Sequence, residues 1–284
     1  MIGRSLTDAG YLADERICSV VYLGDRLGKP VLVEGPAGTG KTELAKSVAA
    51  AAGRRLIRLQ CYEGLDEAKA LYEWNYSKQL LRIQAERTGT DRETADWTDL
   101  QADIFSEEFL LTRPLLAAIR APDPVVLLID EVDRIDVETE ALLLEVLSDY
   151  QISIPELGTV TSTQTPLVFL TSNNSRELSE ALKRRCLYLY LDYPAPEREQ
   201  AIVLRRVPDL SVALADQITR VVGSLRRLEL KKRPSVSETI DWARTLSLLG
   251  VAEISTELVI DTLHVLLKHQ PDIEKAAVEF SRTR

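Results

Sequence analysis

A glycine-rich loop followed by a lysine and a threonine constrains this chain more than any other feature. The loop follows the apolar run 31–33 and matches the pattern G-x-x-x-x-G-K-[ST], which binds phosphate between a strand and a helix. Its residues are Gly35, Pro36, Ala37, Gly38, Thr39, Gly40, Lys41 and Thr42. Backbone N–H groups of such a loop, and the positive end of the helix that follows, surround phosphate oxygens. The sequence therefore predicts a nucleoside triphosphate site.

Three residues at the end of this loop have predicted roles of their own. Lys41 adds a full positive charge beside the phosphates, so it is assigned to catalysis as well as to binding. The hydroxyl of Thr42 is the expected ligand of Mg²⁺. Glu43, the next residue of the helix, is assigned to the nucleotide-binding set. The predicted cofactors are ATP and Mg²⁺.

Two carboxylates at the end of an apolar strand predict the reaction. The run 125–129 is apolar and is followed by Asp130 and Glu131. Asp130 is expected to orient water on Mg²⁺, which makes it the second metal-site residue beside Thr42, and Glu131 is expected to activate or align the attacking water. A small-molecule kinase has to keep water away from the γ-phosphate. A second acid at this place therefore favours hydrolysis, and a kinase is the most distant alternative.

Polar side chains border two later strands. Asn173 follows the strand predicted at 167–170, at the carboxyl end where parallel sheets place ligands, and it is expected to help fix the attacking water. Arg184 and Arg185 come immediately before the strand predicted at 187–191. An arginine that reaches the γ-phosphate of a neighbouring subunit raises turnover by about 10³ to 10⁵. The alternative for this pair is surface charge or a structural ion pair.

The order of predicted elements indicates an α/β fold followed by a helical part. Predicted helices and short apolar strands alternate, which indicates a mostly parallel sheet flanked by helices. These elements are the helices 11–27 and 41–52 and the strands 55–60, 125–129, 167–170 and 187–191. Only helical patterns occur after the prolines at 194 and 196, and Ser235 with Glu238 forms a predicted capping box. We therefore expect an α/β P-loop domain over 1–194 and a small all-α domain over 195–284.

Two segments of the first domain are predicted to project from the sheet. Residues 62–108 are long enough to form an insertion, and its part 86–108 holds eight acidic and two basic residues. This acidic part is either a solvated surface or an acidic contact surface. Residues 151–166 contain Pro155 and Gly158 and are rich in threonine and serine, which favours an exposed β-hairpin.

The net charge and the hydropathy pattern restrict partners and location. The formal charge of −9 disfavours nucleic acid as a partner, because binding to a phosphate backbone needs clustered lysines and arginines. No apolar run exceeds six residues, far below the roughly 20 that span a bilayer. No signal-peptide pattern opens the chain, so we expect a cytoplasmic protein. The three cysteines form no C-x-x-C pair, and no zinc site is expected.

The order and spacing of these motifs resemble those of AAA+ ATPases over nearly the whole chain. The finer resemblance is to the MoxR branch and, within it, to CoxD-type members. It rests on the segments 34–42, 130–134, 154–159 and 181–186. The resemblance implies an AAA+ core whose C-terminal helices form a lid over the nucleotide. Tyr11, with Gly10, matches the N-terminal segment that lines the adenine in relatives, and core packing is the alternative role for Tyr11.

The resemblance also implies roles for single residues. Asn173 corresponds to sensor 1 of the family, and Arg185 corresponds to the arginine finger. Arg184 is the alternative finger. Many MoxR proteins carry a sensor-2 arginine where this chain has Ser237, and Arg233 is the expected substitute, which joins the nucleotide-binding set.

The implied function is that of a chaperone-like, ring-forming ATPase that remodels or matures a partner protein. The ring is expected to be a homo-hexamer. MoxR ATPases act with a von Willebrand factor A-domain protein, and CoxD-type members assist the metal-centre maturation of molybdenum hydroxylases such as carbon monoxide dehydrogenase. The implied partners are therefore such an A-domain protein and a client metalloenzyme. The alternative is a DNA-associated AAA+ motor or loader, although neither a helix-turn-helix pattern nor a long basic face is evident.

Overall fold

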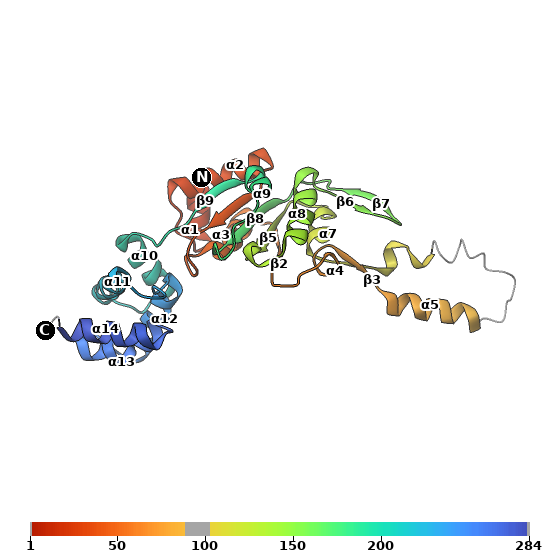
Figure 1. The fold of residues 1–284 in the computed structure, drawn as a ribbon. Coiled ribbons are helices and arrows are strands. Elements are labelled where there is room, and N and C mark those ends of the chain that lie inside the picture. Colours follow the sequence, from red (N-terminus) through yellow and green to blue (C-terminus); the bar gives the residue numbers. More distant parts are fainter. Residues whose placement is uncertain (1, 89–102, 283–284) are drawn as a thin grey trace.

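A parallel sheet forms the centre of the computed structural model, which describes residues 2–88 and 103–282 (Figure 1). The sheet has five strands in the order β2-β5-β8-β1-β9, and every neighbouring pair is parallel. Their bounds are β1 Val31–Glu34, β2 Arg55–Gln60, β5 Val125–Asp130, β8 Leu167–Ser172 and β9 Leu187–Tyr190. The three inner strands β5, β8 and β1 are buried along their whole length. This confirms the predicted α/β class.

Helices cover both faces of the sheet, because side chains alternate between the faces along each strand. Val31 and Val33 pack with α1, α2 and α3, whereas Leu32 packs on the opposite face, where α7, α8 and α9 lie. The bounds are α1 Ile2–Asp8, α2 Glu15–Leu27, α3 Lys41–Ala52, α7 Pro114–Ile119, α8 Val137–Asp149 and α9 Glu180–Arg185. The core therefore lies in two layers, one on each side of the strands.

The helix predicted over 11–27 begins later than the periodicity indicated. The carboxylate of Asp14 accepts a hydrogen bond from the backbone N–H of Ile17 (2.8 Å), which makes Asp14 the N-cap of α2. The helix therefore starts at Glu15, and Tyr11 precedes it in an irregular segment. This segment connects α2 to a first helix, α1, that the periodicity did not predict.

The insertion and the hairpin project at the end of the molecule opposite to the C-terminal helices (Figure 1). The predicted insertion 62–108 contains α4 Glu67–Ala70, β3 Tyr72–Trp74 and α5 Tyr76–Thr88, and the projecting segment continues past residue 108 through the 3₁₀ helix η1 Glu107–Phe109 to β4 Leu110–Thr112. Strands β3 and β4 pair antiparallel, as do β6 Gln151–Ile154 and β7 Gly158–Thr161 of the hairpin. Residues 89–102 of the acidic stretch lie outside the described residues.

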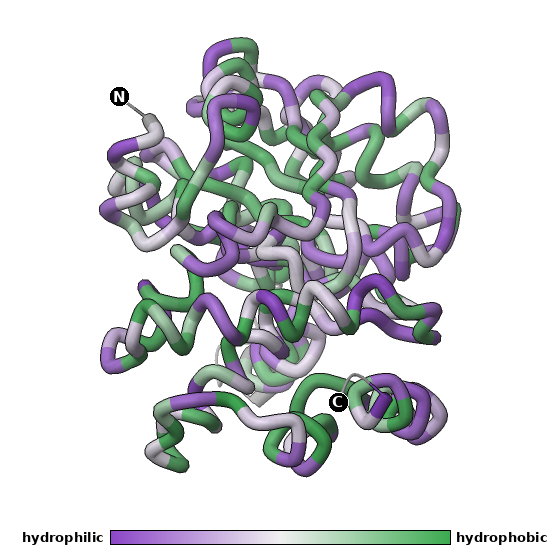
Figure 2. Tube along the Cα trace, turned by 90° about the vertical axis from the view of Figure 1, so that its left-hand side faces the viewer, coloured by the Kyte–Doolittle hydropathy of each residue, from purple (hydrophilic) through white to green (hydrophobic). Residues whose placement is uncertain are grey.

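The C-terminal helices have a hydrophobic core of their own, which includes the fully buried Trp242. They are α10 Pro196–Arg206, α11 Val212–Arg227, α12 Val236–Leu248, α13 Thr256–Leu266 and α14 Gln270–Arg282. Figure 2, viewed from their side, shows them as a group below the part that contains the sheet. The predicted capping box is present at the start of α12, where Ser235 and Glu238 bond each other's backbone N–H. None of the helices that the structure describes has the length and apolar character that a bilayer-spanning segment needs.

A buried ion pair joins three of these helices. The guanidinium of Arg226 on α11 donates two hydrogen bonds to the carboxylate of Glu199 on α10 (2.6 and 2.8 Å). The hydroxyl of Thr239 on α12 donates to the same carboxylate (2.8 Å). The side chains of Arg226 and Glu199 are 12% and 3% exposed. Too little water therefore reaches either charge to solvate it if its partner is removed.

Arg226→Ala is expected to lower the free energy of unfolding by about 3 to 5 kcal/mol, because it leaves the carboxylate of Glu199 buried without a counter-charge. Arg227→Ala, at the exposed next position of α11, removes the same charge and serves as the control, with an expected loss below about 0.5 kcal/mol. Urea unfolding of the full chain measures both. Equal losses in the two variants would contradict the importance of the buried pair.

Candidate nucleotide-hydrolysis site

The glycine-rich loop leaves β1 and turns tightly into α3. Gly35 has a φ of 149°, and a side chain there would overlap the carbonyl oxygen of Leu191, the residue after β9. Gly38 has a φ of 73°, and a side chain there would overlap Ser235 at the start of α12. Glycine is therefore required at both positions, and the C-terminal helices touch the loop at Gly38.

Helix α3 begins at Lys41 with Gly40 as its N-cap, which has no side chain that could occupy the first N–H groups. These groups remain available to an anion, and the helix dipole favours one. The ammonium of Lys41 donates hydrogen bonds to the carbonyl oxygens of Gly35 and Pro36 (2.7 Å each). Burial lowers the pKa of Lys41 to about 8, although Asp133, Asp130 and Glu131 act in the opposite direction.

The hydroxyl of Thr42 and the carboxylate of Asp130 meet at the carboxyl end of the sheet. Thr42 Oγ1 donates to Asp130 Oδ1 (2.9 Å), which leaves the lone pairs of the hydroxyl free for a cation. Thr171 Oγ1 on β8 donates to the same carboxylate oxygen (2.5 Å). Oxygen ligands of this kind are those that Mg²⁺ prefers, so the donor set fits that ion. Asp130 is only 2% exposed, so its position is fixed by these contacts.

Glu131 is held in an unusual backbone conformation beside this pair. Its φ is 58°, and its backbone N–H donates to Thr171 Oγ1 (2.9 Å). Its Oε2 accepts a hydrogen bond from Gln60 Nε2 on β2 (3.1 Å) and lies 2.9 Å from Arg134 Nε. A strained backbone maintained by several contacts is typical of active sites. The carboxylate therefore has a defined position next to the residues that fit a metal.

Asn173 follows β8 and is fixed through its backbone rather than through its amide side chain. Its N–H donates to Asp133 Oδ2 (3.2 Å), which also accepts bonds from the N–H and the hydroxyl of Ser175 (2.9 and 2.6 Å). Burial raises the pKa of Asp133, but these hydrogen bonds outweigh it and hold that pKa below its usual value. Asp133 lies in the 3₁₀ helix η2 (Val132–Arg134), directly after Glu131. The backbone of Asn173 is thus held by a residue two positions after Glu131, the other predicted water-aligning residue.

The two arginines predicted as fingers lie together at the C-terminal end of α9. Both Arg184 and Arg185 are exposed. Within the described part of the chain, neither makes a hydrogen bond or an ion pair. Lys183, one residue earlier, contacts Glu177 and Glu180 instead. Both guanidinium groups are therefore free to reach another molecule.

A cleft of about 780 Å³ lies between the loop and the C-terminal helices. Tyr11 lines it, as do Thr39 and Glu43. The ring of Tyr11 is 9% exposed and packs beside Gly40, and burial raises its pKa to about 12. Tyr11 therefore combines both alternatives, because it is a core residue that also borders the cleft.

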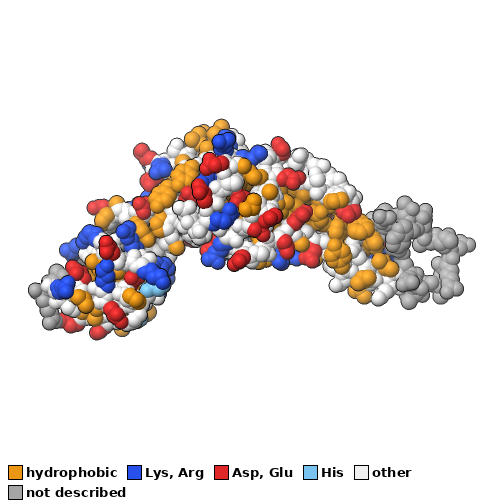
Figure 3. All heavy atoms as spheres, in the orientation of Figure 1, with side chains coloured by type: hydrophobic (Ala, Val, Ile, Leu, Met, Phe, Trp, Pro, Cys, Tyr) orange, Lys and Arg blue, Asp and Glu red, His pale blue; other side chains and the backbone are white. Residues whose placement is uncertain are grey.

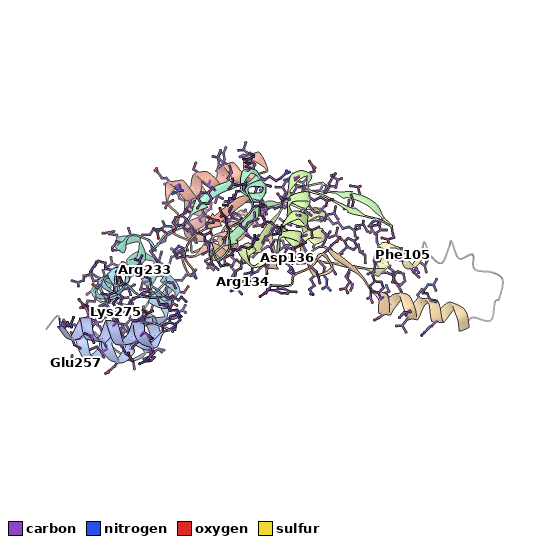
Figure 4. All side chains as sticks on the ribbon, in the orientation of Figure 1. Phe105, Arg134, Asp136, Arg233, Glu257 and Lys275 are labelled. Atoms are coloured by element: carbon purple, nitrogen blue, oxygen red, sulfur yellow. The ribbon has the colours of Figure 1, made fainter. Side chains whose placement is uncertain are left out.

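Arginines other than the expected one line this cleft. Arg233 lies on the C-terminal part and is exposed, but the described lining of the cleft does not include it (Figure 4). Arg198, Arg206 and Arg244 do line the cleft. Arg206 contacts Glu43 (2.5 Å), and Arg244 shares one face of α12 with Ser237. On the face drawn in Figure 3, many lysine and arginine side chains gather over the C-terminal helices.

Four residues of the site were not assigned a role from the sequence: Arg58, Gln60, Asp133 and Thr171. Arg58 and Gln60 are polar side chains two residues apart at the carboxyl end of β2, so strand alternation places both on one face. That spacing could have identified them, had the neighbouring strand been known to be β5. Thr171 could have been found as a hydroxyl residue two positions before Asn173, on the strand that Asn173 follows.

Three comparisons bear on this geometry. A sequence profile of the AAA domain, in its dynein-related subfamily, matches residues 30–186, more than half of the chain. An uncharacterized protein of Staphylococcus haemolyticus is 23% identical over 263 residues, which cover 88% of this chain and 90% of that protein.

Among solved structures, a mutant of RuvB from Thermotoga maritima has a TM-score of 0.55 and 19% identity, covering 94% of this chain and 74% of that one. The RuvB Holliday junction branch migration motor of the same organism has a TM-score of 0.50 and 19% identity, with 89% of this chain and 70% of that one covered. At identities this low, the structural similarity shows a shared fold alone.

Proposed function

Because this chain belongs to the dynein-related subfamily of the AAA domain family, we propose that it is a Mg²⁺-dependent ATPase that remodels a partner protein. The observation that carries the proposal is the contact of Thr42 with Asp130, with Glu131 fixed beside them by Thr171. Bound Mg²⁺ would supply charge stabilisation to the phosphates. Lys41 and the first N–H groups of α3 would bind phosphate oxygens, and Glu131 would align the attacking water.

We propose that the active site is shared between subunits of a ring. Arg184 and Arg185 are exposed and without partners among the described residues, which supports contact with a phosphate on a neighbouring copy. A homo-hexamer is the proposed assembly. The proposed lid is the segment 195–284, and the contact of Ser235 with Gly38 supports that role. Arg198, Arg206 and Arg244 replace Arg233 as the proposed lid cations, because they line the cleft.

The finer proposal is a MoxR-type, CoxD-like chaperone in the cytoplasm. Its proposed partners are a von Willebrand factor A-domain protein and a client metalloenzyme, such as a molybdenum hydroxylase of the carbon monoxide dehydrogenase kind. The projecting insertion supports a protein partner, because Tyr76, Leu80 and Leu81 of α5 are 62%, 59% and 66% exposed. Figure 3 shows hydrophobic side chains gathered at this end of the molecule. Exposed apolar patches on projecting elements are typical of protein contacts.

The second candidate is a DNA-associated motor. RuvB of Thermotoga maritima is described as a Holliday junction branch migration motor, and its fold resembles this one. The net charge of −9 opposes that function for this chain, because DNA binding depends on clustered positive charge. We therefore favour protein as the substrate of the motor.

A pull-down with a Glu131→Gln bait held in ATP is expected to recover an A-domain protein. The same bait that lacks residues 86–108, or that carries Leu80→Ser and Leu81→Ser, should recover at least about tenfold less, because each change removes part of the proposed contact surface. Leu248→Ser, at an 89% exposed position of the C-terminal helices, is the matched control and should recover as much as the parent bait.

Equal recovery by all baits would mean that the contact with the partner lies outside the insertion. DNA binding with a steep dependence on salt, and no recovered protein, would favour the second candidate instead. Both measurements use the full chain in the same ATP-bound state.

A further inference from the structure

A cationic side chain forms an ion pair with the carboxylate that is proposed to hold the metal. The guanidinium of Arg58 on β2 lies against Asp130 Oδ2, with Nε and Nη2 at 3.1 and 2.5 Å. The other carboxylate oxygen, Oδ1, accepts the hydroxyls of Thr42 and Thr171. Arg58 is therefore the only charged group that contacts Asp130 within the described chain.

This contact balances the charge of a buried carboxylate. The side chain of Asp130 is 3% exposed, and a buried carboxylate without a counter-charge is strongly destabilising. Arg58 supplies that charge from the edge strand of the sheet. Its guanidinium also contacts Gln60 Oε1, and Gln60 Nε2 in turn donates to Glu131. Arg58 and Gln60 thus engage both acids from the same strand.

Binding of a cation at Thr42 and Asp130 is expected to change this arrangement. Mg²⁺ carries two positive charges, and a guanidinium beside the same carboxylate repels it. The side chain of Arg58 is 46% exposed, so it can move into water, and the metal would then supply the counter-charge that the buried carboxylate of Asp130 loses.

We propose that Arg58 is a resting-state counter-charge that competes with Mg²⁺ for Asp130 and moves away from Oδ2 when the metal binds with nucleotide. This inference rests on the proposed ATPase function. Arg58 is accordingly a positioning residue that tunes metal affinity and does not touch the nucleotide.

The test is the dissociation constant of Mn²⁺ from the full chain saturated with ADP, measured from the electron paramagnetic resonance signal of free Mn²⁺. ADP avoids turnover, so the readout does not depend on activity. Arg58→Gln removes the competing charge and is expected to bind Mn²⁺ on the order of tenfold tighter. The metal-free variant should unfold at a lower temperature than the parent, and Mn²⁺ with ADP should raise its Tm by more than it raises that of the parent.

Arg55→Gln is the matched control, because Arg55 is an exposed arginine at the other end of β2 without an ion pair to any described residue. It removes the same charge and is expected to leave Mn²⁺ affinity within about twofold. Arg58→Lys keeps the charge and loses the paired contact, so its affinity should lie between those of the parent and the glutamine variant. If Arg58→Gln does not fold, the Mn²⁺ affinity of Arg58→Lys tests the inference in its place.

Unchanged or weaker Mn²⁺ affinity in the Arg58 variants would overturn the inference, because it would mean that Arg58 does not compete with the metal for Asp130. Absence of Mn²⁺ and ADP binding by the parent chain would instead refute the proposed ATPase function. The two failures are therefore distinguishable.

Discussion

Glu131→Gln is expected to lower ATP turnover by about 10² to 10⁴ while ATP stays bound. The range is that of a lost general base, and the substitution keeps the side chain's size. It leaves Lys41, Thr42 and Asp130 in place, so the contacts proposed for the phosphates and the metal remain. Binding of ATP and its rate of hydrolysis are measured separately, by equilibrium binding and by single-turnover release of phosphate.

Lys41→Ala provides the contrast, because it removes the charge that is proposed to bind the phosphates. It is expected to lose nucleotide affinity as well as turnover. Glu138→Gln, at an exposed position in the first turn of α8, makes the same chemical change outside the site and should behave like the parent. Equal losses of ATP binding in Glu131→Gln and Lys41→Ala would mean that the two roles have been assigned wrongly.

The fold could be predicted because its strands are short apolar runs with clear ends. The run 125–129 is apolar on both faces, as a strand covered by helices on two sides must be, and the structure buries all of β5. The start of α2 was predicted wrongly, because apolar periodicity continues to Tyr11 while the helix is set by the capping contact of Asp14. Local capping therefore outweighed the pattern.

Only some residues of the candidate site could be predicted from the sequence. Asp130 and Glu131 are adjacent and follow a strand, so their spacing alone brings them together at the sheet edge. Arg58 and Gln60 are about 70 positions away, and their contact with the acids depends on the pairing of β2 with β5, where Gln60 lies opposite Asp130. Strand order is a property of the whole sheet, and no local pattern encodes it.

The cations of the cleft illustrate the same limit. Arg233 was chosen because it lies close in sequence to the expected sensor position at Ser237. Helix geometry instead brings Arg244, seven positions after Ser237, onto the face of α12 that lines the cleft. Arg198 and Arg206 come from a different helix, α10, and only the contacts of α10 with Asp14 and Glu43 place them there.

Arg185→Ala is expected to retain ATP binding and to lose about 10³ to 10⁵ in turnover, the range found for arginine fingers. The loss should be this large because the guanidinium is proposed to stabilise charge that develops only in the transition state. Lys183→Ala removes a cation two positions earlier that contacts Glu177 and Glu180, and it is expected to keep most of the activity.

Mixing variants tests whether the finger acts on a neighbouring subunit. Arg185→Ala has an intact loop, and Lys41→Ala has an intact finger, so a mixed ring contains interfaces at which both are present. Such a mixture is expected to regain part of the turnover that each variant lacks alone. If it stays inactive while Arg184→Ala mixed with Lys41→Ala recovers, the finger is Arg184. Turnover that does not depend on protein concentration down to the monomer would contradict a shared site, because a monomer cannot bring an arginine at the end of α9 to the loop of another subunit.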